Sequence, residues 1–192
     1  MDVDQRIRKL SYPIEKMTCP IYGLSERSRP DLMGSGVLLR LADTVILLTA
    51  RHVFARCGSD RYVGLDGHIV GLQGKIFKTG GRDDRLDIAV CFLDSSVERE
   101  LPDTDSVLPE QLHVPGTLKR LEHLLTGYPC SKQPRFVGGT VCAQPMTLAC
   151  RSLAQSEHET AGCDPYLSIL VRFDKKNVGT SPRGARLQTC MA

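Results

Sequence analysis

Two short apolar runs around a polar turn, with a histidine just beyond the second run, constrain the fold of this chain most strongly. Residues 34–41 begin with two glycines and continue into an apolar stretch, and residues 45–49 form a second run rich in β-branched side chains. Asp43 and Thr44 supply the turn signal between the two runs. The pattern predicts a β-hairpin that is buried on at least one face.

Further short strands are expected along the rest of the chain, because apolar runs recur between Gly, Pro and Asp residues. The candidate strands are residues 61–65, 68–72, 88–93, 124–128, 136–142, 146–150 and 166–173. Residues 94–116 are polar, contain three prolines and are interpreted as a connector between two halves. Regular short strands with turn signals favour a sandwich or a barrel over a parallel α/β sheet.

Composition excludes several classes of function. The 192 residues are 41% hydrophobic, carry a net charge of +3 and are only 5% aromatic. Without a run of Lys and Arg, and with few aromatic side chains for base stacking, no nucleic-acid partner is expected. No apolar stretch is long enough to span a bilayer, and residues 1–10 lack the apolar core of a signal peptide. We therefore expect a protein of the cytoplasm with no membrane contact.

The eight cysteines are expected to be buried or partly buried free thiols, because a cytoplasmic compartment is reducing. No C-x-x-C pair occurs among them, and neither His113 nor His123 has a cysteine at ligand spacing. The sequence therefore predicts no metal site.

His52 and Asp87 are the candidate catalytic residues. His52 follows a buried strand at the start of a turn, so the core holds it while it faces a cleft, as a general base requires. Asp87 leads directly into another apolar strand, and a carboxylate at that position can orient the imidazole and stabilise its protonated form. Taken singly, His52 can equally be a core or turn histidine, and Asp87 a residue that caps the entry to a strand.

Together these segments resemble the trypsin-like serine peptidases of the chymotrypsin fold, and in particular their bacterial-type members. The resemblance is carried by Gly-Ser-Gly-Val at 34–37, Leu-Thr-Ala-Arg-His-Val at 48–53 and Asp-Ile-Ala-Val at 87–90. It implies an all-β fold of two antiparallel barrel-like halves, residues 14–104 and an incomplete second half at 117–192. It also implies a peptide or protein substrate, no cofactor, and a triad in which His52 is the base and Asp87 the acid.

The second half resembles the family less closely. Residues 125–129 are similar to the strand that opens the second barrel, and residues 173–184 to the loop before the nucleophile. Ser181 is the candidate nucleophile there, but Thr180 stands in place of the usual acid and Pro182-Arg183 in place of Gly-Gly. With few residues after Ser181, we expect a truncated and inactive serine endopeptidase domain. The alternative is a non-catalytic peptide- or protein-binding module, which would use the cleft or an exposed sheet edge.

Overall fold

Strands predominate in the structure, a computed structural model. It describes residues 3–26, 29–65, 68–80, 86–99, 101, 106–112, 122–131, 135–137, 140–153, 160, 171–180 and 187–188. Within this part of the chain, helices are few and short apart from one at the N-terminus. The mostly β fold expected from the sequence is confirmed.

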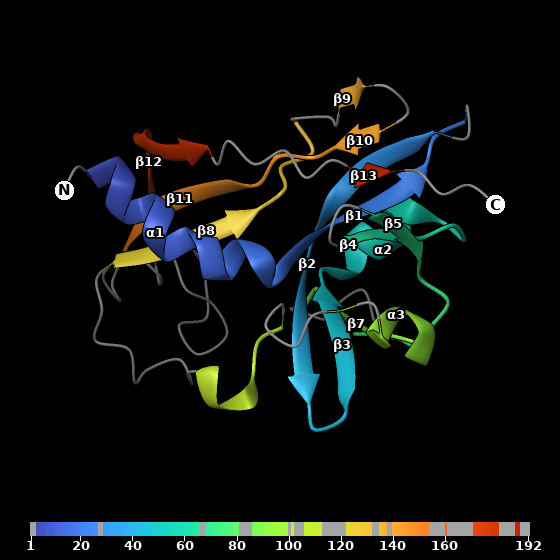
Figure 1. Ribbon diagram of the computed structural model, residues 1–192. Helices are drawn as coiled ribbons and strands as arrows, with labels where there is room; N and C mark the ends of the chain where they lie inside the picture. The colour runs from blue at the N-terminus through green and yellow to red at the C-terminus, as the bar shows by residue number, and fades with distance from the viewer. Residues whose placement is uncertain are drawn as a thin grey trace.

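The larger of two sheets has the strand order β6-β7-β3-β2-β1-β4-β5-β13-β10-β9 (Figure 1). Its strands are β1 (Thr18–Leu24), β2 (Pro30–Leu41), β3 (Thr44–Thr49), β4 (Tyr62–Leu65), β5 (His68–Gly71), β6 (Ile76–Lys78), β7 (Ala89–Phe92), β9 (Arg135–Val137), β10 (Thr140–Cys142) and β13 (Leu187–Gln188). All pairs are antiparallel except β5 with β13. Among the described residues the order runs from edge strand β6 to edge strand β9 and does not close on itself.

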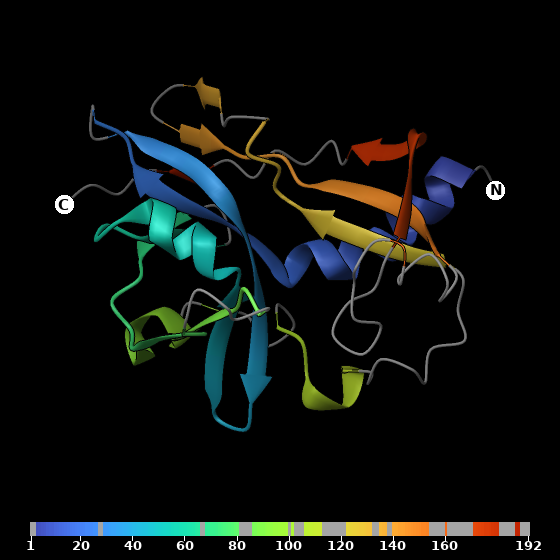
Figure 2. The same ribbon diagram turned by 180° about the vertical axis from the view of Figure 1, so that it is seen from behind.

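The smaller sheet has the order β12-β11-β8 and lies beside the N-terminal helix α1 (Val3–Lys16), as Figure 2 shows from behind. Its strands are β8 (Glu122–Gly127), β11 (Met146–Ser152) and β12 (Val171–Thr180). Glu15 of α1 accepts hydrogen bonds from Ser11 (2.8 Å) and from Thr147 of β11 (3.4 Å), which helps to hold the helix on this sheet. None of the described helices is both long enough and apolar enough to cross a membrane.

The predicted hairpin is present as β2 and β3, with Leu41 paired to Thr44. The turn lies one residue earlier than predicted, at Ala42 and Asp43, and Ala42 has a positive φ of 51°. The expected strands at 61–65, 68–72, 88–93, 124–128 and 146–150 correspond to β4, β5, β7, β8 and β11. The candidate at 136–142 divides into β9 and β10, and most of the one at 166–173 lies outside the described residues.

The described part of the connector expected at 94–116 includes two short helices. It contains the helix α3 (Ser95–Arg99) and the short 3₁₀ helix η2 (Pro109–Gln111). The side chain of Asp94 accepts the backbone N–H groups of Ser96 (2.9 Å) and Val97 (3.3 Å), and this cap allows α3 to begin directly after β7.

The main core lies between the larger sheet and helix α2 (Arg51–Cys57), which contributes Val53, Phe54 and Cys57. A second cluster joins Tyr22 and Leu32 of the larger sheet to Tyr128 and Ala143 beyond β8 and β10. The core is mainly aliphatic, and the five cysteines that the structure describes with their side chains are free thiols, as expected: Cys19, Cys57, Cys91, Cys130 and Cys150.

Gly36 provides a test of the packing inside the larger sheet. A Cβ atom at Gly36 would lie 2.4 Å from Cδ1 of Leu47 and 3.1 Å from Cδ1 of Ile21, both in the core. We expect Gly36→Ala to lower the free energy of unfolding by about 1–3 kcal/mol, because a well-packed core has no room for an added methyl group. The measurement is urea denaturation followed by circular dichroism.

Gly71→Ala is the matched control, since a Cβ atom at Gly71 of β5 meets nothing within 4 Å. Its free energy of unfolding should stay within about 0.5 kcal/mol of the wild-type value. Equal losses in the two variants would contradict the packing described at Gly36.

Candidate functional site

Helix α2 carries His52 and rests on strand β2 at Gly34. A Cβ atom at Gly34 would lie 2.7 Å from Cγ2 of Val53, so the bare backbone there allows the helix to approach the strand closely. The hydroxyl of Thr49, at the end of β3, donates to the carbonyl oxygen of Ser35 (2.8 Å) and fixes the entry to the helix. His52 therefore lies in the first turn of a helix rather than in the turn that the sequence predicted.

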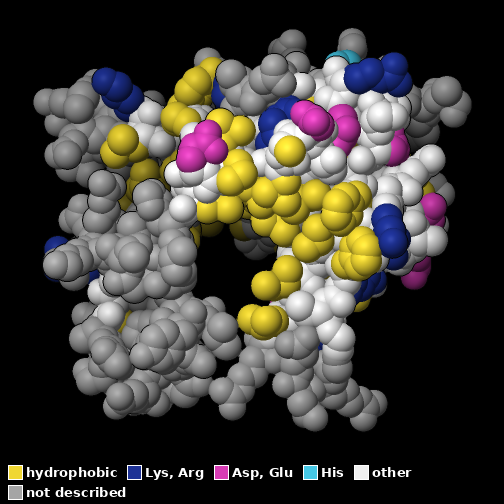
Figure 3. Space-filling view, turned by 90° about the horizontal axis from the view of Figure 1, so that it is seen from below, with side chains coloured by type: hydrophobic (Ala, Val, Ile, Leu, Met, Phe, Trp, Pro, Cys, Tyr) yellow, Lys and Arg dark blue, Asp and Glu magenta, His cyan; other side chains and the backbone are white. Residues whose placement is uncertain are grey.

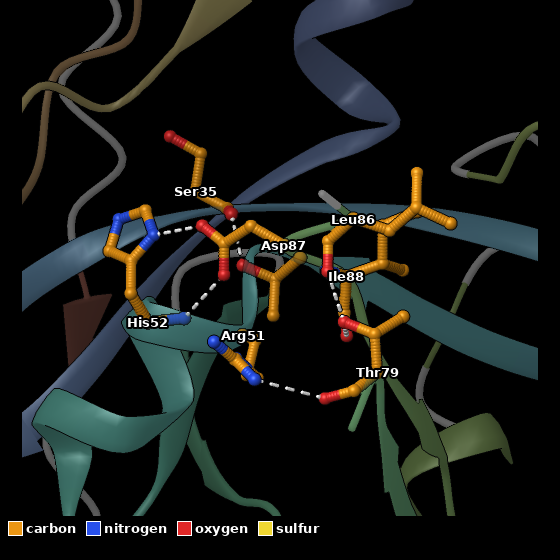
Figure 4. Close-up of polar contacts among 8 residues, drawn as sticks. Ser35, Arg51, His52, Thr79, Leu86, Asp87 and Ile88 are labelled. Carbon is orange, nitrogen blue, oxygen red and sulfur yellow. Dashed lines mark hydrogen bonds and ion pairs between the residues drawn. The ribbon is translucent and has the colours of Figure 1, made fainter. Parts of the chain in front are cut away.

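Asp87, which lies two residues before β7, contacts the start of helix α2 at three points (Figure 4). The ring Nδ1 of His52 donates to Oδ2 of Asp87, and the backbone N–H of His52 donates to Oδ1 (3.0 Å). The backbone N–H of Arg51 donates to the carbonyl oxygen of Asp87 (3.2 Å). Ala50, the N-cap residue, provides no side-chain cap, so the carboxylate of Asp87 takes that role from a distant part of the chain.

The arrangement leaves His52 able to accept a proton. Because a carboxylate accepts hydrogen bonds, the Nδ1 facing Asp87 carries the proton and Nε2 presents its lone pair on the other side of the ring. The His52 side chain is 62% exposed, so a substrate or a hydroxyl group can reach it. The hydrogen bond from the His52 ring, aided by its backbone N–H and by nearby positive charge, holds the pKa of Asp87 below the ordinary value.

Thr79 fixes the segment on which Asp87 stands. Its hydroxyl accepts the backbone N–H of Ile88 (3.1 Å) and lies within hydrogen-bonding distance of the carbonyl oxygens of Leu86 and Ile88. Its own backbone N–H donates to the Ile88 carbonyl oxygen (2.9 Å), and its carbonyl oxygen accepts from Nη1 of Arg51 (3.3 Å). Thr79 thus holds the residues on both sides of Asp87, as Figure 4 shows.

Ser35 connects this site to the smaller sheet. Its hydroxyl accepts the backbone N–H of Tyr128 (2.6 Å), which follows β8, while its carbonyl oxygen is bound by Thr49. Sequence analysis assigned no role to Ser35, Thr79 or Arg51. Their contacts depend on the folded sheet, and the only local signals were the place of Arg51 directly before His52 and that of Ser35 within Gly-Ser-Gly-Val at 34–37.

Ser181, the predicted nucleophile, lies outside the described residues. The segment before it differs from the expected loop, since residues 171–180 form strand β12 and its Gly179 and Thr180 pair with Thr147 and Met146 of β11. Pairing with β11 satisfies their backbone groups in the sheet. In Figures 1 and 2, β12 lies on the opposite side of the molecule from α2. The structure therefore brings together His52 and Asp87, but no described residue of the β12 segment lies beside them.

Neither a comparison with models of known protein families nor a search of curated proteins finds a match to this chain. Within the described part of the chain, no three His, Cys, Asp or Glu side chains are grouped so that they could hold a metal ion. What the site offers chemically is an exposed imidazole, oriented by a carboxylate, that can take a proton from a hydroxyl group or from water.

The lowered pKa of Asp87 can be tested through His52. We expect His52→Ala to raise the pKa of Asp87 towards its ordinary value, because the ring hydrogen bond that stabilises the carboxylate is lost. The measurement is an NMR titration of the carboxyl carbon, with His68→Ala, which changes another exposed histidine, as the control. A carboxylate whose pKa is lowered by folding stabilises the fold at neutral pH, and this contribution is lost as the pH falls through the pKa of the folded state. An unchanged titration in His52→Ala would contradict the pairing.

The role of Thr79 can be tested with two substitutions of similar size. Thr79→Val removes the hydroxyl that binds Ile88, and we expect amide exchange of Ile88 to become about fivefold faster, as for one lost hydrogen bond of about 1 kcal/mol. Thr79→Ser keeps a hydroxyl and should keep most of the protection. Equal protection of Ile88 in the valine and serine variants would show that the hydroxyl has no such role.

Proposed function

We propose that this chain is a trypsin-like serine endopeptidase domain in which His52 is the general base and Asp87 the acid that orients it, and that, in contrast to the inactivity expected from the sequence, this base activates a serine. The observation that carries the proposal is the two-point contact of the Asp87 carboxylate with the ring and the backbone of His52. This contact fixes both the direction and the tautomer of the imidazole while the side chain stays exposed. A histidine that served only to fill the core would be buried instead.

The arrangement of the strands supports the two halves expected from the resemblance. Strands β1 to β7 all fall within residues 14–104, and their main core is shared with α2. Strands β8, β11 and β12 fall within residues 117–192 and form the smaller sheet, whereas β9, β10 and β13 of the same range extend the larger sheet beyond β5. We include in the proposal that these are two barrel-like halves, between which the hydrogen bond from Tyr128 to Ser35 is one link.

The proposed reaction uses the free ring nitrogen. As a serine oxygen attacks the carbonyl carbon of a peptide bond, Nε2 of His52 takes the proton of the hydroxyl group. The carboxylate of Asp87 stabilises the imidazolium ion that results, and Nε2 then gives the proton to the departing amine. A water molecule, activated by the same nitrogen, hydrolyses the acyl-enzyme and restores the serine. Ser181 is the candidate that the sequence offers for the nucleophile.

A fluorophosphonate probe tests this proposal, because it labels only a serine that has been activated as a nucleophile. The proposal predicts one labelled serine, and His52→Ala or Asp87→Asn should slow the labelling about 100-fold or more, as for loss of a general base or of its orientation. Mass spectrometry of the labelled peptide identifies the serine, and Ser181→Ala shows directly whether it is Ser181.

Two outcomes would contradict the proposal. A serine that is labelled equally fast in the wild type and in His52→Ala would not depend on the proposed base. No labelling at all, in a chain that still binds peptides, would favour the alternative of a non-catalytic binding module on the same fold.

A further inference from the structure

Among the described residues, strand β6 is an edge strand with no strand paired on its outer side. The backbone N–H of Phe92 donates to the carbonyl oxygen of Lys75, and that of Thr79 to Ile88 (both 2.9 Å). Because hydrogen-bonded pairs alternate along antiparallel strands, Phe77 also faces β7. The N–H and C=O groups of Ile76 and Lys78 therefore point away from β7, and no described residue forms a hydrogen bond with them there. Such an edge can accept another strand.

Aromatic side chains lie beside this edge. The rings of Phe77 and Phe92 meet edge to face, with centroids 5.7 Å apart, yet the two residues are 48% and 41% exposed. Phe77 is paired with Val90, so these side chains share the outer face of the sheet. Figure 3 shows hydrophobic side chains gathered on one face of the molecule, with both basic and acidic side chains at its margin. An exposed aromatic pair at an open edge indicates a contact surface.

Two exposed lysines, Lys75 and Lys78, stand at this edge. The Nζ atom of Lys75 lies 4.8 Å from the centre of the Phe77 ring, and neither Lys75 nor Lys78 forms an ion pair with a described residue. Burial raises the pKa of the Cys57 thiol to about 11, while the positive charges of Arg61, Arg56 and Lys78 act in the opposite direction. Of these three cations Lys78 belongs to β6, while Arg56 lies in α2 and Arg61 follows that helix.

The acidic side chains of the neighbouring α3 segment are already engaged. Asp94 accepts the backbone N–H groups of Ser96 and Val97, and Glu98 accepts the backbone N–H of Val45 (2.8 Å). Both carboxylates remain charged but accept hydrogen bonds from the chain itself, whereas Lys75 and Lys78 stand exposed on either side of Phe77. An incoming strand would therefore meet apolar surface flanked by unpaired positive charge.

We propose that the β6 edge binds an extended acidic segment of a partner protein as an added antiparallel strand. The N–H and C=O groups of Ile76 and Lys78 form its backbone hydrogen bonds, in the manner of β-strand addition. A residue of the segment opposite Lys78 is acidic, and its neighbour, whose side chain points to the other face, is apolar and packs on Phe77. This surface uses neither His52 nor Asp87, so the proposal does not depend on peptidase activity.

The probe is a fluorescein-labelled heptapeptide of alternating sequence, Glu-Val-Glu-Val-Glu-Val-Glu, and binding is measured by fluorescence anisotropy. His52→Ala serves as the background, so that the probe is not cleaved. We expect the double variant K75E/K78E to weaken binding about tenfold or more, since the direct attraction at Lys78 becomes a repulsion and the nearby positive charge of Lys75 is reversed, and Phe77→Ala to weaken it about fivefold. The control K9E/R29E makes the same change of charge at exposed residues outside β6 and should leave the affinity unchanged.

Methylated peptides test the strand pairing without altering the protein. In the proposed register the N–H groups of the Glu residues point to β6, so N-methylation of the Glu residues should abolish binding and N-methylation of the Val residues should spare it. Equal effects of the two methylations would overturn strand addition. Equal affinity for a peptide with Lys in place of Glu, or no binding of the probe at all, would overturn the acidic partner. Circular dichroism establishes that each variant is folded.

Discussion

The position of His52, the candidate base, depends on a glycine in strand β2, where no side chain separates the strand from helix α2. Gly34 of β2 lies against Val53, so that α2 approaches the sheet more closely than any other residue would allow. His52 is adjacent to Val53, and once that contact is made the helix cannot shift along the strand without a clash. The hydrogen bond from the Thr49 hydroxyl to the carbonyl oxygen of Ser35 holds the chain where it leaves β3 and enters α2. The site is therefore placed by core packing.

Asp87 has a structural and a chemical role at once. The N-terminus of α2 has no cap from its own segment, and the carboxylate of Asp87 supplies one while it binds the His52 ring. Because the Asp87 carboxylate accepts a backbone N–H group at the start of α2, the fold itself holds it in place. The imidazole of His52 therefore meets a carboxylate that is already in position. Because both groups remain exposed, water screens their attraction, and the pair contributes to chemistry more than to stability.

Strand β6 links the two proposals physically. Thr79, directly after the strand, holds the segment of Asp87, while the opposite side of Ile76 and Lys78 is paired with no described strand. A strand added at this edge would be hydrogen-bonded to residues next to Thr79. Occupation of the edge and the orientation of Asp87 are in this way connected through one short strand, although each can be measured separately.

The sequence by itself determined the hairpin of β2 and β3, most of the short strands, and His52 and Asp87 as a candidate pair, because these follow from local apolar patterns and from motifs. It could not predict the cap that Asp87 provides for α2, or the hydrogen bonds between Thr79 and Ile88 and between Ser35 and Tyr128. These contacts join residues distant in the chain, and only the folded sheet brings them within hydrogen-bonding distance. It also missed α1, whose place depends on packing against β8, β11 and β12. The local apolar pattern thus determined where the strands form. Tertiary structure determined which strand ends lie next to each other, because pairing between distant segments leaves no signal within any one segment.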